Sequence, residues 1–526
     1  MKTCIKVSAG LLALAATVSC GRQEADSYLA DDDPFGLLSH EQIVLGEKLD
    51  DPYSVENVTK ALASLYPTKA EYTVAETDYY VRFLPADETQ YARLVESGLE
   101  LMDHPLDYKI IQDGDWYHDP AIDEEAITWQ YAVVPHDFTF PSGVRYEILE
   151  RCYISDHDPA TRAGDDGIDW EAVEREAFRL TGNEDLLVPM TKAKSKPAGR
   201  ITIVDENANG GKAFGVAGVK VVCNSFVKFA SCYTDRDGYY EISKKYSSTV
   251  RYRLMFKNKT GFAIGVNLIL VPASMSALGK GPSQGLDVEI TAESDRKLFT
   301  RCVVNNAVYE YLDRCKEEDM DLPCPPKNLR IWLFQGMKAS SACMLRHGAV
   351  VDHSVIKKFL GDYGSLIKLF LPDITLGLKG LESYADIYSV TCHELAHASH
   401  FQQVGKSWWN KYIFYVLSSY VSTGEVYGDG TGENAGYCEV GEMWGFYMQN
   451  QMYNDRYGGV MPVAGSSFWF APQILRYLAE RGMTRSEIFR GMTDDVHSAA
   501  ELQAKLKVLY PDRSSQIDQV FDRYSK

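Results

Sequence analysis

The stretch TCHELAHASH at residues 391–400 decides how the rest of the chain is interpreted, because it contains the pattern H-E-x-x-H. Residues four apart on an α-helix point in nearly the same direction, so His393 and His397 can bind one metal ion together. Glu394 lies one step round the helix, where its carboxylate can reach a water on the metal and act as a general base. The pattern predicts a helix that ends near Gly405, since glycine often terminates helices.

A catalytic zinc site needs a third protein ligand and one open position. The segment GYCEVGEMWGFY at residues 436–447 follows after enough chain for a loop and a returning helix. Its two acidic residues, Glu439 and Glu442, are three apart and share a helix face, so both are candidates at this point. His400 also lies near the face of His393 and His397, but three histidines from one helix are a poor primary site.

The segment GEMWGFY at 441–447 resembles the ligand segment N-E-G-F-A-x-Y of one branch of the gluzincin zinc peptidases. The resemblance implies a Zn²⁺ cofactor, hydrolysis of peptide bonds, and Glu442 as the third metal ligand beside His393 and His397. Glu439 would then be a neighbour of the ligand. The chain departs from the family in three ways: Gly441 replaces the asparagine, the G-x-M-E-N motif is missing, and no aspartate follows Glu442 to orient a histidine.

The implied mechanism is metal-assisted hydrolysis, with Glu394 taking a proton from the attacking water and delivering it to the leaving amine. A donor beside the metal must stabilise the oxyanion, and Tyr447, Tyr457 and His497 are the candidates that the sequence offers. In zincins a strand upstream of the metal-binding helix lines the substrate cleft. We expect residues 374–378 to form that strand.

Residues 196–290 contain short strands separated by Asp/Gly turns, which predicts a β-sandwich. The pattern T-D-x-D-G-x-Y at 234–240, which follows a G-V-x-G-V-x-V strand, resembles the carboxypeptidase regulatory-like (transthyretin-like) module. That module is structural in its family. Asp235 and Asp237 are interpreted as turn formers rather than metal ligands.

The predicted fold is multidomain. An α+β domain of unknown role is expected at 36–195, the transthyretin-like β-sandwich at 196–290, and a mainly α zincin-like metallopeptidase domain at 291–526. Within the last domain, residues 296–315 have the pattern of an amphipathic helix and residues 328–334 that of a strand.

Residues 1–19 predict a signal peptide, with Lys2 and Lys6 before a short apolar run. Ending on small residues before Cys20, this segment resembles a bacterial lipobox, which implies cleavage before Cys20 and acylation of its thiol. The acidic stretch at 20–35 predicts a solvated tether and resembles that of surface lipoproteins of Bacteroidota. We therefore expect an exported protein anchored by its lipid to the outer membrane, on the periplasmic or cell-surface face.

Composition narrows the partners. The chain has 526 residues, 45% of them hydrophobic and 24% charged, which is typical of globular proteins. Its formal net charge of −19 argues against a nucleic-acid partner. We expect a monomer that acts on a peptide or protein and contacts the membrane only through lipidated Cys20.

The eleven cysteines leave the disulfide pattern open. Nine remain beyond Cys4 in the signal peptide and Cys20, so at least one is unpaired within the chain. Cys223 with Cys232 and Cys315 with Cys324 are possible pairs. Cys392 and Cys438, next to the ligand segments, are interpreted first as packed core thiols.

Two functions stay open at this level. The first is a zinc-dependent peptidase with Glu394 as general base. The alternative is a catalytically inactive zincin-like surface lipoprotein that binds a glycan or a protein. The presence of Glu394 favours the enzyme, because a binding scaffold has no need of a general base.

Overall fold

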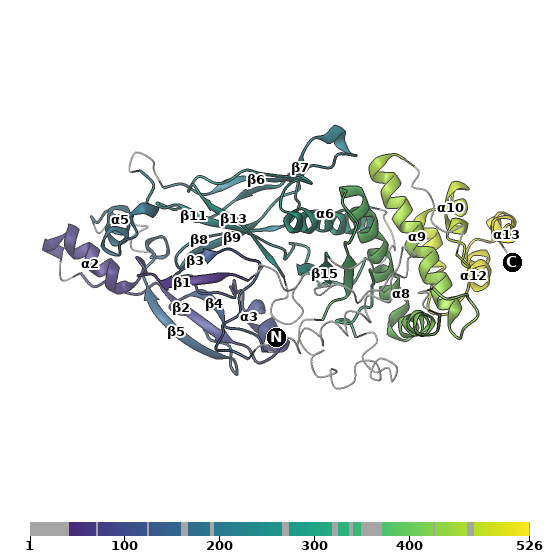
Figure 1. Cartoon of the computed structure of the whole chain (residues 1–526), viewed down its shortest axis with the longest axis horizontal. Helices are drawn as coiled ribbons and strands as arrows, with labels where there is room; N and C mark the ends of the chain where they lie inside the picture. Colours follow the sequence, from purple (N-terminus) through teal and green to yellow (C-terminus); the bar gives the residue numbers. More distant parts are fainter. Residues whose placement is uncertain are drawn as a thin grey trace.

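The computed structural model describes residues 42–524 except 70–71, 124–125, 159–166, 190–193, 266–272, 318–323, 336–339, 349–370, 424–426 and 460–467. The predicted signal peptide, Cys20 and the tether lie outside the described residues. The fold mixes helix and sheet, with 39% of residues helical and 22% in strands. Several separate sheets occupy one end of the molecule and a helical C-terminal region the other (Figure 1). This broad arrangement confirms the mixed fold class that the sequence predicted, while the domain boundaries stay predictions.

The N-terminal region contains two small antiparallel sheets, β4-β2-β5 and β1-β3, with helices beside them. Its elements are β1 (Val44–Lys48), α2 (Val55–Leu65), β2 (Asp78–Leu84), α3 (Glu88–Glu96), β3 (Tyr108–Gln112), β4 (Gln130–Pro135), β5 (Arg145–Cys152) and α5 (Trp170–Leu180). The side chain of Asp87 caps α3 by accepting a hydrogen bond from the backbone N–H of Gln90. An aspartate at this position satisfies a donor that the first helical turn would otherwise leave unpaired.

The middle region forms two further sheets, β10-β6-β14 with β7 beside β6, and β13-β11-β8-β9. Its strands are β6 (Ala198–Ile203), β7 (Phe214–Gly215), β8 (Lys220–Ser225), β9 (Lys228–Tyr233), β10 (Tyr239–Glu241), β11 (Val250–Met255), β12 (Ala263–Gly265), β13 (Met275–Gly281) and β14 (Val288–Ile290). Asp235 accepts hydrogen bonds from the backbone N–H groups of Asp237 and Tyr239. Its carboxylate therefore builds the turn, as the sequence predicted.

One sheet joins the middle and C-terminal regions. Strand β12 pairs in parallel with β15 (Arg330–Phe334), which pairs in parallel with β16 (Ile374–Gly377). Residues of the middle-region strands, of α6 and of the C-terminal helices also belong to a single hydrophobic core. The predicted division near residue 290 therefore does not separate two independent cores.

Helix α6 (Arg296–Glu317) forms where the sequence predicted a helix, but the amphipathic interpretation is wrong. Arg301, Asn305 and Asn306 are buried together with the apolar residues of this helix. The reason is its position between the sandwich strands and α8 (Figure 1). Asn305 donates to the backbone oxygen of Ala217, and Asn306 accepts from the backbone N–H of the same residue. These bonds make burial of the amides tolerable.

The C-terminal helices pack around α8 and α9. They are α8 (Tyr384–Thr423), α9 (Ala435–Tyr457), α10 (Gln473–Glu480), α11 (Arg485–Arg490), α12 (Ala499–Leu509) and α13 (Ser514–Asp522). Gly405 interrupts α8 with φ 77° and ψ 178°, a conformation that glycine alone adopts readily. The helix expected to end near Gly405 breaks there, and a second helical run follows at once. None of the described helices is both long and apolar enough to cross a membrane.

Arg456, near the end of α9, connects the middle region to the helices. Its guanidinium bonds Asp205 at 2.9 Å and Glu310 of α6 at 2.6 Å. It also lies over the rings of Tyr384 and Tyr388 of α8, with 4.6 and 5.1 Å to their centroids. Because Asp205 is fully buried, this arginine holds a carboxylate that has no access to water.

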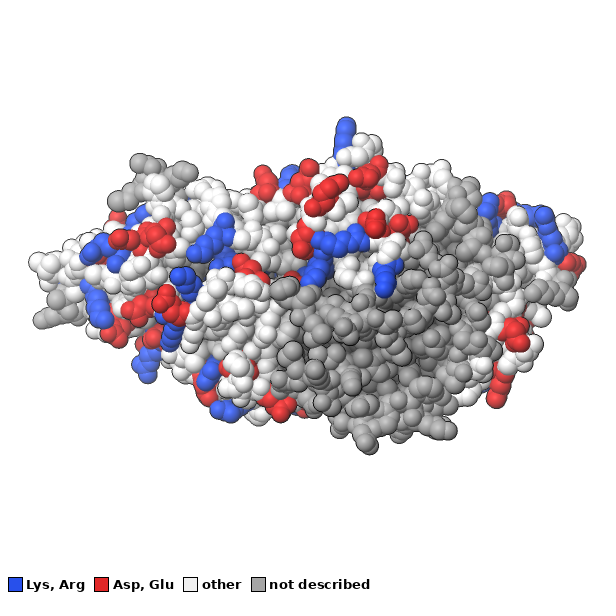
Figure 2. Space-filling view, viewed as in Figure 1, with Lys and Arg blue, Asp and Glu red and all other residues white. Residues whose placement is uncertain are grey.

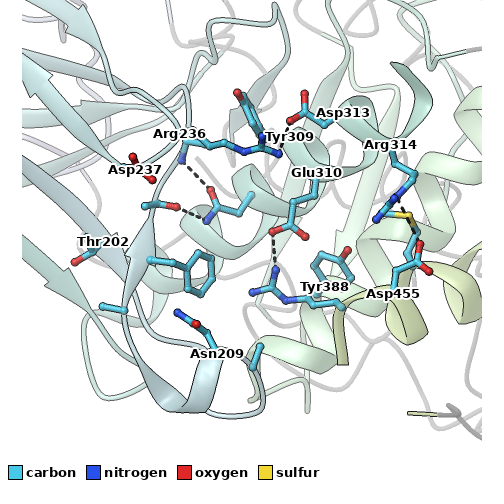
Figure 3. A pocket seen from close by; sticks show the side chains of 18 of the residues that line it. Thr202, Asn209, Arg236, Asp237, Tyr309, Glu310, Asp313, Arg314, Tyr388 and Asp455 are labelled. Carbon is cyan, nitrogen blue, oxygen red and sulfur yellow. Dashed lines mark hydrogen bonds and ion pairs between the residues drawn. The ribbon is translucent and has the colours of Figure 1, made fainter. Parts of the chain in front are cut away.

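The groove beside this junction measures about 860 Å³ and is lined from both regions. Figure 3 shows Arg236 of the sandwich region facing Asp313 of α6, and Arg314 of α6 facing Asp455 of α9. The charged side chains that line the groove therefore form ion pairs between neighbouring elements. These ion pairs connect the middle region, α6 and α9.

Replacing Arg456 tests how much this junction stabilises the fold. We expect Arg456→Met to lower the free energy of unfolding by about 3–5 kcal/mol, because the buried Asp205 loses its cation. The matched control Arg476→Met removes only a part-exposed pair with Glu480, worth less than about 1 kcal/mol. Urea titration followed by tryptophan fluorescence measures both. Equal losses of unfolding free energy in the two variants would contradict this prediction, because the Arg456 ion pairs would then stabilise the fold no more than a part-exposed pair does.

Candidate metal centre

Three side chains converge between α8 and α9: His393 and His397 from α8, and Glu442 from α9. One ligand atom from each lies within 4.8 Å of the others, and all three residues are buried. This triad can hold a metal ion. The structure thus brings together the three residues that the sequence proposed as ligands.

The triad has dimensions that suit a tetrahedral ion. The Nε2 atoms of the two histidines are 3.1 Å apart. Carboxylate oxygens of Glu442 lie 3.5 Å from Nε2 of His393 and 3.6 Å from Nε2 of His397. Ligand atoms about 2.0–2.1 Å from one tetrahedral ion are about 3.3 Å from each other. The separations, of which the last two are to different oxygens of Glu442, lie within a few tenths of an ångström of that value, so the residues fit a metal.

A glycine permits this close approach of the two helices. A Cβ atom on Gly445 would come within 2.9 Å of the rings of both His393 and His397. Gly445 follows Glu442 by three residues, so both residues lie on the α9 face that meets α8. A side chain at this position would push the histidines away from Glu442.

Each of two ligands has a hydrogen-bond partner from the opposite helix. Nδ1 of His393 lies 3.2 Å from Oε1 of Gln449 on α9. The hydroxyl of Tyr412, on α8 beyond the break, donates to Oε1 of Glu442 at 2.6 Å. Such partners fix the orientation of a metal ligand and tune its basicity.

The break at Gly405 lets the second run of α8 pack against the first. Trp409 and Tyr412 thereby lie beside the ring of His397, with centroids 5.8 and 5.7 Å away. On the other side, the ring of Phe446 meets that of His393 edge-on at 4.7 Å. The ligands therefore sit in an aromatic shell of low polarity, which strengthens electrostatic interactions at the centre.

Glu394 lies fully buried beside the triad. Burial raises its pKa well above the usual value, and the nearby charge of Glu442 raises it further. Among the described residues, neither of its oxygens has a hydrogen-bond partner. A buried carboxylate in this state is costly unless a cation or a bound proton donor compensates it. A bound metal ion would supply the cation, and its water would supply the proton donor.

The pKa shifts of His397 and Glu442 favour the protonation states in which these side chains bind metals. Burial lowers the pKa of His397 to about 3, so its imidazole is neutral at physiological pH. Burial alone would raise the pKa of Glu442, but His397, His393 and the Tyr412 hydroxyl lower it overall. A neutral imidazole and an ionised carboxylate are the ligand forms of these side chains.

The remaining candidates lie in other environments. Glu439 faces α12 and accepts a hydrogen bond from the backbone N–H of Ala499 at 2.8 Å. His400 is packed against Trp408 with ring centroids 4.5 Å apart, and burial lowers its pKa to about 3. Of the two glutamates, Glu442 alone belongs to the metal-binding group.

The three proposed oxyanion donors are spread over the domain. The hydroxyl of Tyr457 donates to Asp205 in the junction with the sandwich. His497 bonds the backbone oxygen of Asp494 at the surface. Tyr447 lies on the same helix as Glu442, and its ring packs against Trp444.

The strand expected at 374–378 forms as β16, beside β15. Thr375 exchanges two backbone hydrogen bonds with Ser341, so a further extended segment pairs with the free side of β16. The thiol of nearby Cys343 is close enough to Glu394 for that carboxylate to raise its pKa, although burial is the larger cause. The segment around Ser341 therefore borders both β16 and Glu394.

Cysteines do not contribute to the centre. Cys392 and Cys438, next to the two ligand segments, are buried and form no disulfide. This confirms the interpretation of these two as packed core thiols. In the β8–β9 pair, Cys223 lies opposite Ala230 and Cys232 opposite Val221, so the two thiols are not directly opposed.

Sequence reasoning missed Gln449, Tyr412 and Gly445. Gln449 follows Glu442 by seven residues, two helical turns, and this spacing was a usable signal for a residue on the same face. Tyr412 gave no such signal, because the break at Gly405 places it. Gly445 was visible as a glycine inside a helical pattern, which often marks a close approach.

Comparisons with known proteins add no relative. No model of a known protein family matches the chain, and no curated protein matches it. The centre is therefore interpreted from its own geometry.

Gly445→Ala tests the close approach. The added methyl group meets two ligand rings at 2.9 Å, so we expect affinity for Co²⁺ to fall at least about tenfold. Gly441→Ala on the same helix is the control, because its Cβ meets only ordinary contacts at 3.4 Å. Both variants gain helix propensity equally, so helix propensity does not explain a difference. Titration followed by visible absorption measures the affinity, and unchanged binding in Gly445→Ala would contradict the argument.

Proposed function

We propose that this protein is a zinc-dependent peptidase of gluzincin type. The observation that carries the proposal is the buried His393–His397–Glu442 triad with the carboxylate of Glu394 beside it. Two histidines and a glutamate form the ligand set of known catalytic zinc sites in peptidases. A neighbouring carboxylate acts as the general base in such sites. A donor set of imidazole nitrogens and one carboxylate suits zinc among the common metals.

The residues divide the work of hydrolysis. A bound zinc would supply an acidified water and polarise the scissile carbonyl. Glu394 accepts the proton of the attacking water and returns it to the leaving amine. Tyr412 and Gln449 keep Glu442 and His393 in their binding orientations. Tyr447, on the same helix as Glu442, is a candidate for stabilising the oxyanion.

The setting of the enzyme is part of the proposal. The lipobox-like segment before Cys20 supports an exported protein anchored to the outer membrane of a bacterium resembling Bacteroidota. The two sheets of residues 198–290, in which all strand pairs but β6–β14 are antiparallel, support the carboxypeptidase regulatory-like assignment of the middle region. On the face in Figure 2, acidic and basic side chains are interspersed over the described surface, and the net charge is −19. Nucleic acid is therefore left out, and the proposed substrate is a peptide or protein.

Zinc content tests the ligand assignment. We expect one zinc per chain in the wild type and in Glu439→Ala, and loss of zinc in Glu442→Ala, because only Glu442 faces the histidines. Glu439→Ala is a matched control on the same helix. Elemental analysis after dialysis measures the stoichiometry. Loss of zinc in both variants, or in neither, would contradict the assignment.

Casein digestion tests the enzyme itself. We expect Glu394→Gln to keep its zinc and to lose activity by about 10²–10⁴-fold, because a general base contributes that much. Zinc content of the same sample is the control. Stoichiometric zinc without cleavage by the wild type would favour the alternative, a zincin-like scaffold that binds a glycan or protein.

A further inference from the structure

A short relay of polar side chains runs from α8 to α9 and back to the metal centre. Nε2 of Gln449 donates to Oγ of Ser389 at 2.9 Å, and Oε1 of Gln449 lies 3.2 Å from Nδ1 of His393. Ser389 precedes His393 by four residues, so it lies one turn away on the same side of α8. The amide of Gln449 is thus held at both ends, and its oxygen is directed at the ligand ring.

This relay selects the tautomer that binds a metal. An amide oxygen only accepts hydrogen bonds, so Nδ1 of His393 carries the proton. Nε2 then keeps its lone pair, and Nε2 is the atom that faces Glu442 and His397. The hydrogen bond of one ring nitrogen thereby decides which atom is available to the metal.

We propose that Gln449 is the positioning residue for His393, and that its neutral amide makes the metal centre weaker and more exchangeable than a carboxylate at the same place would. This inference rests on the proposed metal centre. A carboxylate partner raises the basicity of a ligating histidine, and a charge-assisted hydrogen bond is about twice as strong as a neutral one. Gln449 gives the orientation without that gain.

The position tolerates the changes that the test needs. Gln449 is only half-buried, whereas both neighbours on the ligand face, Glu442 and Gly445, are buried. A glutamate at 449 has the same length, and the Ser389 hydroxyl can donate to it in place of accepting from the amide. Gln449→Glu therefore preserves both contacts and adds a charge, while Gln449→Leu removes both.

Gln403 supplies the matched control. Gln403 lies on α8, the helix that carries His393 and His397. Its amide donates to the backbone oxygens of Phe489 and Met492, away from the metal ligands. Gln403→Leu removes a half-buried anchor of equal size without touching the centre. A loss of metal affinity that came only from a weakened fold would affect Gln403→Leu as well.

The experiment measures zinc affinity by competition with a chromophoric chelator, together with the rate at which an excess of chelator removes zinc. We expect Gln449→Leu to bind about 10–100-fold more weakly than the wild type and Gln449→Glu about tenfold more tightly, with slower zinc loss. Gln403→Leu should match the wild type in both. Gln449→Glu decides the matter even if Gln449→Leu does not fold.

The outcomes separate this inference from the proposed function. A wild type that binds no zinc overturns the metal centre itself. A wild type that binds one zinc, with affinity equal in Gln449→Glu and Gln449→Leu, overturns only the role of Gln449. Equal losses in Gln449→Leu and Gln403→Leu, with no gain in Gln449→Glu, also overturn it, since the effect would then be structural.

Discussion

The contact between Gly445 and the two histidine rings is the constraint on which the centre depends. Helix α9 can bring Glu442 within 3.6 Å of both imidazoles only because no Cβ stands between the helices. The same approach places Gln449 two turns further on against His393. One missing methyl group therefore sets the spacing of the ligands and the reach of a supporting side chain.

The centre concentrates polar groups where the fold excludes water. Glu394, Glu442, His393 and His397 are all at most 2% exposed, inside a shell of aromatic rings. Burying two carboxylates side by side is unfavourable, and the raised pKa of Glu394 expresses that cost. A divalent cation at the triad would reverse the balance, because it attracts both carboxylates and needs a neutral imidazole at each histidine. The triad could therefore hold a metal ion whose charge offsets the burial of these carboxylates.

The metal-binding helices are not an isolated module. Strand β12 of the middle region extends the sheet of β15 and β16, and Arg456 ties α9 to the sandwich and to α6. The buried Arg301 of α6 adds a bidentate ion pair with Asp115 of the N-terminal region, at 2.8 and 2.9 Å. Interactions of this kind fix the regions to each other, since breaking one leaves an unpaired buried charge.

The sequence by itself determined the features that depend on local spacing. The helical face of His393 and His397, the position of Glu394 beside them, the end of a helical run at Gly405 and the Asp235 turn all follow from residues a few positions apart. It also narrowed the third ligand to Glu439 or Glu442, and resemblance to a family favoured the second. Only the tertiary structure decided what depends on residues far apart. It turned Glu439 towards α12, brought Tyr412 to Glu442 and Gln449 to His393, and buried the polar face of α6. Local patterns cannot specify these contacts, because each depends on how two elements pack against each other, and packing is set by the whole core.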